Sequence, residues 1–379
     1  MTKLIPVFVI CMILAVASHQ KSDFSHSRER YRKKETVFYT IMAVIMILFV
    51  GLRTSYNDTY AYRHAYEMMN PVDSLIDVVT DWSLGANPGF ALANSIMKAL
   101  GVSTQSFVLI YAVITNGIYL WFLRKYTNNI WLTIFLFFAL GCFTFTMAAI
   151  KQCVAVAFCV VGVDQLLDKR SDNPHFYFVL WVIIASFFHP YALMFLVVPF
   201  LMFKPWGRET YQILAIFAVM GLMLQFLVGT IVDVTTMLGE EFDEASFSGE
   251  GVNPFRLAVC AVPLLLSFVA RKNIAQMDEQ KERLFFLFTN LSILNAEIMF
   301  VALFGTANYF ARLANYFLIF QALAIPWLLQ FFEEKSRKLV TVTAVICYCL
   351  YFVYANAINQ YFDVLYKGIS LLDYLASLF

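Results

Sequence analysis

The stretch WLTIFLFFALGCFTFTMAAIKQCVAVAFCVVGVDQLL, from Trp131 to Leu167, decides the fold class of this protein. Lys151 and Asp164 are its only charged residues. A helix rises about 1.5 Å per residue, so one helix over the whole stretch would be almost twice as long as the roughly 30 Å hydrocarbon core of a bilayer. The pair Lys151-Gln152 therefore predicts a turn between two membrane-spanning helices.

The composition of the whole chain is strongly apolar as well. Of its 379 residues, 61% are hydrophobic and 14% are charged, whereas soluble proteins have roughly 45–50% apolar and about 25% charged residues. A soluble globular fold and a disordered chain are excluded. A nucleic-acid partner is not expected, because the net charge is +1 and no basic face dominates. The cysteines form no CxxC pair and the histidines lack ligand spacing with them, so we expect no metal and no cofactor.

These features predict an all-α, polytopic integral membrane bundle that forms a single domain over 1–379. A span needs about 20 apolar residues, and about twelve segments approach that length once their flanks are included. They lie at approximately 4–18, 37–52, 105–123, 131–149, 152–167, 176–188, 191–203, 211–232, 255–270, 284–304, 312–332 and 339–357. The first contains a signal-peptidase-like Ala15-Val16-Ala17, but the cations that follow it would resist export, so we expect an uncleaved span.

The distribution of cations predicts the orientation. With the N-terminus outside, most of the 27 Lys and Arg residues fall in inner loops, as the positive-inside rule requires. Both termini and the two long polar loops, 53–87 and the acidic 233–254, are then extracytoplasmic. This polar outer face is where we expect the protein to work.

Two further helices are expected at that outer face. The extracytoplasmic region 53–104 contains a helix at 88–100, with Asn87 as its cap residue and Gly101 at its end. At about 13 residues and roughly 20 Å it is too short to span, so we interpret it as re-entrant or interfacial. Apolar residues recur every three or four positions over 358–379, which predicts one amphipathic interfacial helix.

The loop after the second span is the richest in candidate binding residues. Tyr56 and Tyr60 recur at helical spacing with charged residues, and flat rings beside charged groups are typical of saccharide sites. The alternative is a tyrosine-rich interfacial belt with solvated charges. Arg53 and Asp58 lie beside a span end, where a charge is more constrained.

Four outer cations lie at span ends, namely Arg53, Lys151 (with Gln152 beside it), Arg256 and Arg312. If they converge, they form an anion site, and a diphosphate is the natural ligand for it. If they do not, each is an interfacial anchor. His189-Pro190 predicts another outer turn, and a histidine there can accept a proton near neutral pH, with Asp58 as a carboxylate that could orient its ring. The alternative is a histidine that only holds the turn.

Short motifs in a set order give the chain a resemblance to the EpsG family of bacterial exopolysaccharide and capsule clusters, related in role to Wzy-type O-antigen polymerases. They are Gly51-Leu52-Arg53 with Asn57-Asp58-Thr59 and Tyr62, Asn87-Pro88-Gly89-Phe90, Lys151-Gln152-Cys153-Val154-Ala155, Phe188-His189-Pro190-Tyr191-Ala192, and, with less weight, Arg312-Leu313-Ala314-Asn315-Tyr316-Phe317. The chain departs from the family pattern where Asn57 replaces Gly, Asn87 an acid, Lys151 an Arg and Tyr191 a Ser.

The resemblance implies a glycosyltransferase that polymerises oligosaccharide repeat units carried on undecaprenyl diphosphate. The reaction would take place at the outer face of the bacterial cytoplasmic membrane and use no nucleotide sugar. His189 and Asp58 are then the catalytic candidates, and Arg53, Lys151, Gln152, Arg256, Arg312, Tyr56 and Tyr60 are the candidates for binding substrate. Membrane lipid, a chain-length regulator and a flippase of the same pathway are the expected partners.

Three alternatives stay open at the sequence level. A transporter or flippase of lipid-linked saccharide suits the number of spans, although the two halves show no internal repeat. A membrane O-acyltransferase could use His189, but its acyl donor is cytoplasmic. A noncatalytic assembly protein is the third.

The orientation is testable by labelling with an impermeant thiol reagent. In a variant without native cysteines, Asn70→Cys should react from outside intact cells and Asp278→Cys should not. Labelling in the opposite sense would invert the topology and remove every site argument that depends on it.

Overall fold

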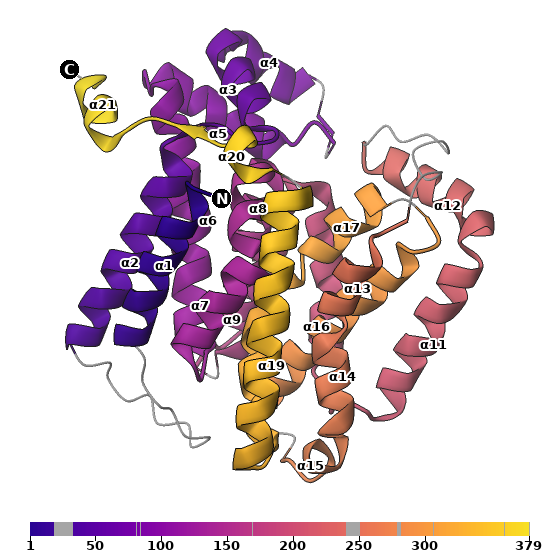
Figure 1. Cartoon of the computed structure of the whole chain (residues 1–379). Coiled ribbons are helices and arrows are strands. Elements are labelled where there is room, and N and C mark those ends of the chain that lie inside the picture. Colours follow the sequence, from indigo (N-terminus) through magenta and orange to yellow (C-terminus); the bar gives the residue numbers. More distant parts are fainter. Residues whose placement is uncertain are drawn as a thin grey trace. The chain divides into compact units, whose positions relative to one another are not determined.

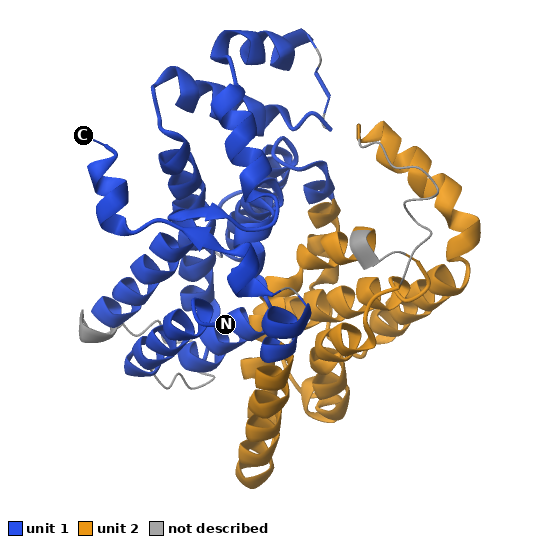
Figure 2. Ribbon diagram, turned by 45° about the horizontal axis from the view of Figure 1, so that its top comes forward, with its two compact units in different colours: residues 1–193, 352–379 blue, residues 194–351 orange. Residues whose placement is uncertain are grey.

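The computed structural model describes residues 1–18, 33–80, 82–83, 85–168, 170–239, 251–278, 282–305, 307–359 and 361–378. The cationic segment 19–32 and most of the acidic loop, 240–250, lie outside the described residues. The chain divides into two compact units (Figure 2): unit 1 comprises 1–193 and 352–379, and unit 2 comprises 194–351. Both are built almost entirely from helices, which confirms an all-α protein.

Unit 1 contains both long apolar helices and several short elements. Its elements are α1 (Leu4–Ala17), α2 (Lys33–Gly51), β1 (Arg53–Ser55), α3 (Thr59–Met68), α4 (Pro71–Thr80), α5 (Pro88–Ala99), α6 (Thr104–Tyr126), α7 (Ile130–Ala139), α8 (Cys142–Ala148), α9 (Ile150–Leu167), α10 (Pro174–Ser186), α20 (Phe362–Leu365), β2 (Lys367–Gly368) and α21 (Leu371–Ala376). The 3₁₀ segment η1 (Pro190–Leu201) runs from unit 1 into unit 2.

Unit 2 continues the chain with helices that are often short or bent. They are α11 (Arg208–Leu222), α12 (Leu224–Met237), α13 (Pro254–Cys260), α14 (Val262–Val269), α15 (Arg271–Ala275), α16 (Arg283–Val301), α17 (Ala307–Asn315), α18 (Leu318–Leu328), η3 (Leu329–Phe331) and α19 (Glu334–Val353). The π-helical segment η4 (Tyr354–Asn359) extends α19 back into unit 1.

The predicted count of twelve membrane spans is not confirmed. In the described part of the chain, four helices are long and apolar enough to cross a membrane, namely α6, α9, α16 and α19 with η4. Counting each of three bent pairs as one span raises the number to seven. The pairs bend by 48° between α7 and α8, by 96° between α11 and α12, and by 54° between α17 and α18. Helix breaks such as Gly141, at φ +81, shorten segments that read as continuous in sequence.

Unit 1 is organised around α6, which packs against α2 and α9, while α9 packs against α10 and α1 lies against α2 and α7 (Figure 1). Its polar contacts gather at two ends. At one end the Asp164 carboxylate accepts hydrogen bonds from Lys125 and from the Tyr126 hydroxyl, at 2.6 Å for the latter. Arg124 donates to Thr36 there, at 2.9 Å. All of these lie at or beside predicted inner loops.

The other end of unit 1 brings together segments that were all predicted outside. Thr59 donates to the carbonyl of Met147 at 3.0 Å, and the amide of Gly89 donates to the carbonyl of Phe187 at 2.9 Å. β1 pairs with β2 of the C-terminal segment. The grouping of loops therefore agrees with the predicted topology, while the side of the membrane that each end faces stays a prediction.

The short helix predicted at 88–100 is confirmed as α5, with Pro88 in its first turn and Gly101 at φ +73 after its end. Asn87 precedes it as expected but makes no side-chain capping bond, because its own backbone is left-handed at φ 53. Whether α5 is re-entrant or interfacial stays a prediction.

The single amphipathic helix predicted over 358–379 is wrong. The chain there breaks into the end of η4, α20, β2 and α21. Tyr361 has φ 47, which interrupts a right-handed helix, and Lys367–Gly368 is extended because it pairs with β1. Ser370 then starts α21 as the N-cap of a capping box with Asp373. Long-range pairing with β1 has overridden the local helical pattern.

Unit 2 packs around α16, which lies against α11, α13, α14, α17 and α18. Asn295 on α16 donates to the carbonyl of Ala314 at 2.6 Å, and its oxygen accepts from Gln321 on α18 at 2.8 Å. Glu297, predicted to face the interior, is 9% exposed. Buried amides that are hydrogen-bonded in this way tie α16 to α17 and α18.

Two glycines provide a matched test of packing at the α2–α6 contact. A Cβ on Gly51 would lie 2.3 Å from Leu109 Cδ1 and 3.1 Å from Leu109 Cα, whereas a Cβ on Gly117 would meet nothing within 4 Å. We expect Gly51→Ala to lower the free energy of unfolding by about 1–3 kcal/mol through overpacking. Gly117→Ala, in the middle of α6, should raise it by about 0.5–1 kcal/mol.

Thermal midpoints of the purified protein in detergent measure both changes. Equal midpoints for the two variants would show that Gly51 on α2 does not lie against Leu109 on α6.

Candidate functional site

Four of the five motifs meet at one end of unit 1. The contact between Thr59 and Met147 joins the first motif to the end of α8, just before α9, and the contact between Gly89 and Phe187 joins the second to the end of α10. The ring of Phe90 lies 5.8 Å from that of Tyr62 and 6.0 Å from the Lys151 ammonium. Segments separated by up to about 130 residues thus form one site, which we call the motif site of unit 1.

Arg53 is the buried centre of that site. Its side chain is 1% exposed. Nε donates to the Thr59 hydroxyl at 2.9 Å and Nη1 donates to the carbonyl of Val50 at 2.5 Å. Val50 lies in the last turn of α2, where the helix dipole favours a cation. Among the described residues no carboxylate forms an ion pair with Arg53.

Burial lowers the pKa of the Arg53 guanidinium to about 10, while nearby Tyr366 and Cys153 oppose the shift and Arg63 adds to it. The group therefore stays charged at neutral pH. A buried cation is costly unless hydrogen bonds compensate for it. Val50 and Thr59 supply that compensation, so the visible role of Arg53 is to hold β1 and the start of α3 in place.

Gln105 and Arg63 complete this arrangement and were not predicted as site residues. The Gln105 amide nitrogen donates to the carbonyls of Gly51 and Arg53, at 2.7 and 3.2 Å. Its oxygen accepts from Arg63 Nη1 at 2.6 Å. The motif Gly51-Leu52-Arg53 is thus tied to both α3 and α6. The helical spacing of Arg63 with Tyr56 and Tyr60 was the only sequence signal for this connection.

The structure gives a physical reason for two of the motif residues. Asn57, which departs from the glycine of the family pattern, has φ 44, and asparagine tolerates this left-handed region better than most residues. A Cβ on Gly89 would lie 2.9 Å from the Cβ of Phe187, so only glycine fits where α5 begins. Both positions depend on backbone geometry that the sequence pattern alone does not reveal.

The predicted aromatic and acidic residues fall into two groups. Tyr56 is fully buried against Phe362, with ring centroids 5.2 Å apart, and burial raises its pKa to about 12. Tyr60 is 68% exposed and stacks on His64. Asp58 is exposed, and its carboxylate makes no hydrogen bond or ion pair with the described residues, so it does not orient His189 in this structure. Of these three residues, only Tyr60 and Asp58 are accessible to a ligand in this structure.

The two predicted turns of the site are confirmed. α8 ends at Ala148 and α9 begins at Ile150, so half-buried Lys151 and buried Gln152 lie in the first turn of α9. α10 ends at Ser186 and η1 begins at Pro190, with half-buried His189 between them. The His189 ring lies 5.4 Å from that of Tyr191.

Arg256 and Arg312 belong to unit 2, where α13 and α17 carry them. Arg256 is half-buried and donates from Nη2 to Asn315 Oδ1 at 3.1 Å. Arg312 is exposed and lies three residues before Asn315, on the same side of α17. Both guanidinium groups therefore belong to residues near Asn315 in unit 2. Within the described ranges no three His, Cys, Asp or Glu side chains are grouped as a metal ion would require.

Apolar helices with polar side chains gathered at helix ends define a polytopic helical membrane protein. The model of the EpsG family matches residues 36–367, most of the chain, so the protein belongs to the EpsG family, a family of membrane proteins of exopolysaccharide biosynthesis. No match was found among curated proteins or solved structures.

Thr59 allows the hydrogen bonding of the motif site to be tested. Thr59→Val keeps the shape of the side chain but leaves Arg53 Nε and the Met147 carbonyl without their shared partner. We expect it to lower the free energy of unfolding by about 1–3 kcal/mol, the usual cost of an unsatisfied buried group. Thr59→Ser retains the hydroxyl and should lose less than half as much. Chemical denaturation in detergent measures both, and equal losses would show that methyl packing is what matters at residue 59.

Proposed function

We propose that the protein polymerises oligosaccharide repeat units carried on undecaprenyl diphosphate, at the outer face of the bacterial cytoplasmic membrane. The observation that carries the proposal is the convergence of four family motifs at one end of unit 1 in a member of the EpsG family. Cations and aromatic rings gather there. Both suit a ligand that combines a diphosphate with sugars.

The reaction is a glycosyl transfer. An acceptor hydroxyl attacks the anomeric carbon of the donor, and the bond from that carbon to the diphosphate oxygen breaks. The electron pair leaves with the diphosphate, and the acceptor proton passes to a base. Negative charge thus grows on a diphosphate, and fixed cations in a site of low dielectric constant stabilise that change most effectively.

The exposures of the residues suggest a division of roles. In unit 1, half-buried Lys151 contacts the diphosphate in our proposal. In unit 2, taken by itself, half-buried Arg256 and exposed Arg312 are the candidates for binding substrate. Arg53 contributes its charge from within and holds the motif site together. Tyr60 stacks its ring on a sugar face. Tyr56 and Gln152 are buried, so their role is to pack behind the residues that contact substrate. His189 accepts the acceptor proton or orients the hydroxyl, and Asp58 is the alternative base.

The proposal is tested with purified protein and a lipid-linked repeat unit, scored for chain growth. We expect His189→Gln to fold and to elongate about 10²-fold more slowly, a typical general-base contribution. Arg312→Ala should slow growth by at least about 10-fold through loss of one charge-assisted contact. Lys338→Ala is the matched control, because Lys338 is an exposed cation paired with Glu334 on α19. It should grow chains at the normal rate.

Two results would contradict the proposal. Normal chain growth by both His189→Gln and Arg312→Ala would remove these residues from the site. An acyl donor as the only productive substrate of the wild-type protein would replace glycosyl transfer with acyl transfer. In cells, loss of a polymerase leaves single repeat units on lipid at the surface, whereas loss of a transporter leaves them trapped inside.

A further inference from the structure

The C-terminal segment 361–369, which we call the strap, lies over the turn that contains Arg53. β2 of the strap pairs antiparallel with β1, with Gly368 opposite Arg53. The amide of Ile369 donates to the carbonyl of Leu52 at 3.0 Å, and the Tyr366 hydroxyl donates to the carbonyl of Phe49 at 2.8 Å. The strap thus fastens both the end of α2 and the residue before Arg53.

Aromatic packing holds the strap in this position. The ring of Tyr366 stacks on that of Phe49, with centroids 4.5 Å apart and planes 5° apart. Phe362 is fully buried and contacts Phe49, Tyr56 and Tyr366. Burial raises the pKa of Tyr366 to about 12, although nearby Arg53 opposes the shift, so its hydroxyl is neutral and able to donate. These contacts indicate a fixed clamp.

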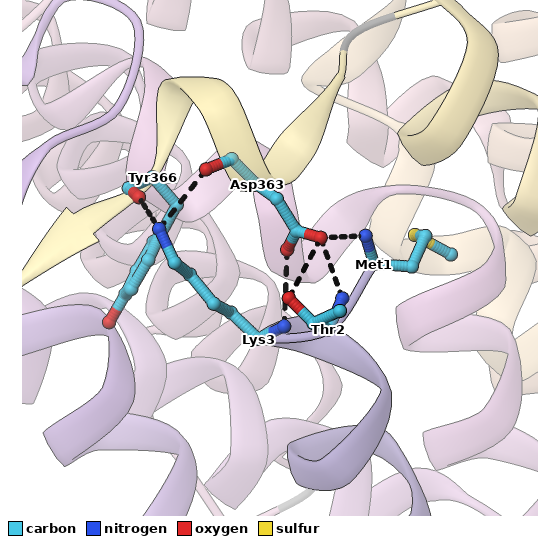
Figure 3. Close-up of polar contacts among 5 residues, drawn as sticks. All are labelled: Met1, Thr2, Lys3, Asp363 and Tyr366. Atoms are coloured by element: carbon cyan, nitrogen blue, oxygen red, sulfur yellow. Dashed lines mark hydrogen bonds and ion pairs between the residues drawn. The ribbon is translucent and has the colours of Figure 1, made fainter.

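A polar latch joins the strap to the start of the chain, through Asp363 (Figure 3). The carboxylate accepts hydrogen bonds from the Met1 ammonium and from the amides of Thr2 and Lys3, at 2.6 and 3.1 Å for the amides. Lys3 Nζ donates to the carbonyls of Asp363 and Tyr366, at 3.1 and 2.7 Å. Burial alone would raise the pKa of Asp363, but these hydrogen bonds lower it well below its usual value.

We propose that the strap is part of the functional site and that Asp363 and Tyr366 are positioning residues for Arg53. Arg53 has no carboxylate partner among the described residues, so its guanidinium is placed by one carbonyl, one hydroxyl and the backbone that the strap holds. The expected effect of the strap on chain growth rests on the proposed function. The hold of the strap on Arg53 can be measured separately.

Hydrogen exchange of backbone amides over 49–56, followed by mass spectrometry, measures that hold. Asp363→Asn and the milder Tyr366→Phe should each accelerate exchange over 49–56 and leave α6 unchanged. Asp373→Asn is the matched control, because Asp373 is an exposed C-terminal carboxylate that bonds only Ser370. It should leave 49–56 unchanged. Unaltered exchange over 49–56 in both strap variants would overturn the proposal.

Chain growth is measured on the same preparations. A small misplacement of a catalytic group can cost about 10²-fold, so Asp363→Asn should slow growth by at least about 10-fold at normal protein level. Asp363→Glu, which restores the carboxylate, should recover most of it. Normal growth in a variant with accelerated exchange would overturn the positioning role.

A disulfide between residues 2 and 363 tests whether the strap acts by staying in place or has to open during the reaction. In a variant without native cysteines, Thr2→Cys with Asp363→Cys should stay active when oxidised and resemble Asp363→Asn when reduced. Inactivity of the oxidised form, reversed by reduction, would show that the strap must open and would overturn the proposal. If the wild-type protein extends no chains at all, the proposed function fails, while accelerated exchange in Asp363→Asn would still support the hold of the strap on Arg53.

Discussion

The buried charge of Arg53 is the constraint on which one end of unit 1 depends. A guanidinium removed from water needs acceptors for its donors, and here a helix-end carbonyl and one hydroxyl accept two of the five N–H groups. That hydroxyl belongs to Thr59, which in turn reaches the backbone before α9. The hydrogen bonds that Arg53 requires therefore connect α2, α3 and α8.

Two further elements contact the same turn. Gln105 ties the carbonyls of the Arg53 turn to Arg63, and the strap pairs with β1 from the other side. Backbone groups at the edge of a membrane need partners because the hydrocarbon core offers none. Here they find them within the protein, so the turn is rigid enough to place a charge.

A rigid positive site suits the chemistry proposed for an EpsG protein. The leaving diphosphate gains charge during glycosyl transfer, and preorganised cations stabilise that charge without having to reorganise at the moment of reaction. In unit 1, Arg53 is a buried charge held by hydrogen bonds. In unit 2, taken by itself, Arg256 and Arg312 are more accessible.

The sequence by itself determined the class of protein, because long apolar runs admit only a membrane-embedded helical fold. The turns at Lys151 and His189, the start of α5 and the family were also predictable, since Pro, Gly and interrupting polar residues act locally. The tertiary structure alone decided that Arg53 and Tyr56 are buried and that 361–369 forms a strap instead of a helix. Each of these depends on a partner far away in the chain, such as Phe49 for Tyr366, and a local hydrophobic pattern shows which side of a segment is apolar without showing what will cover it.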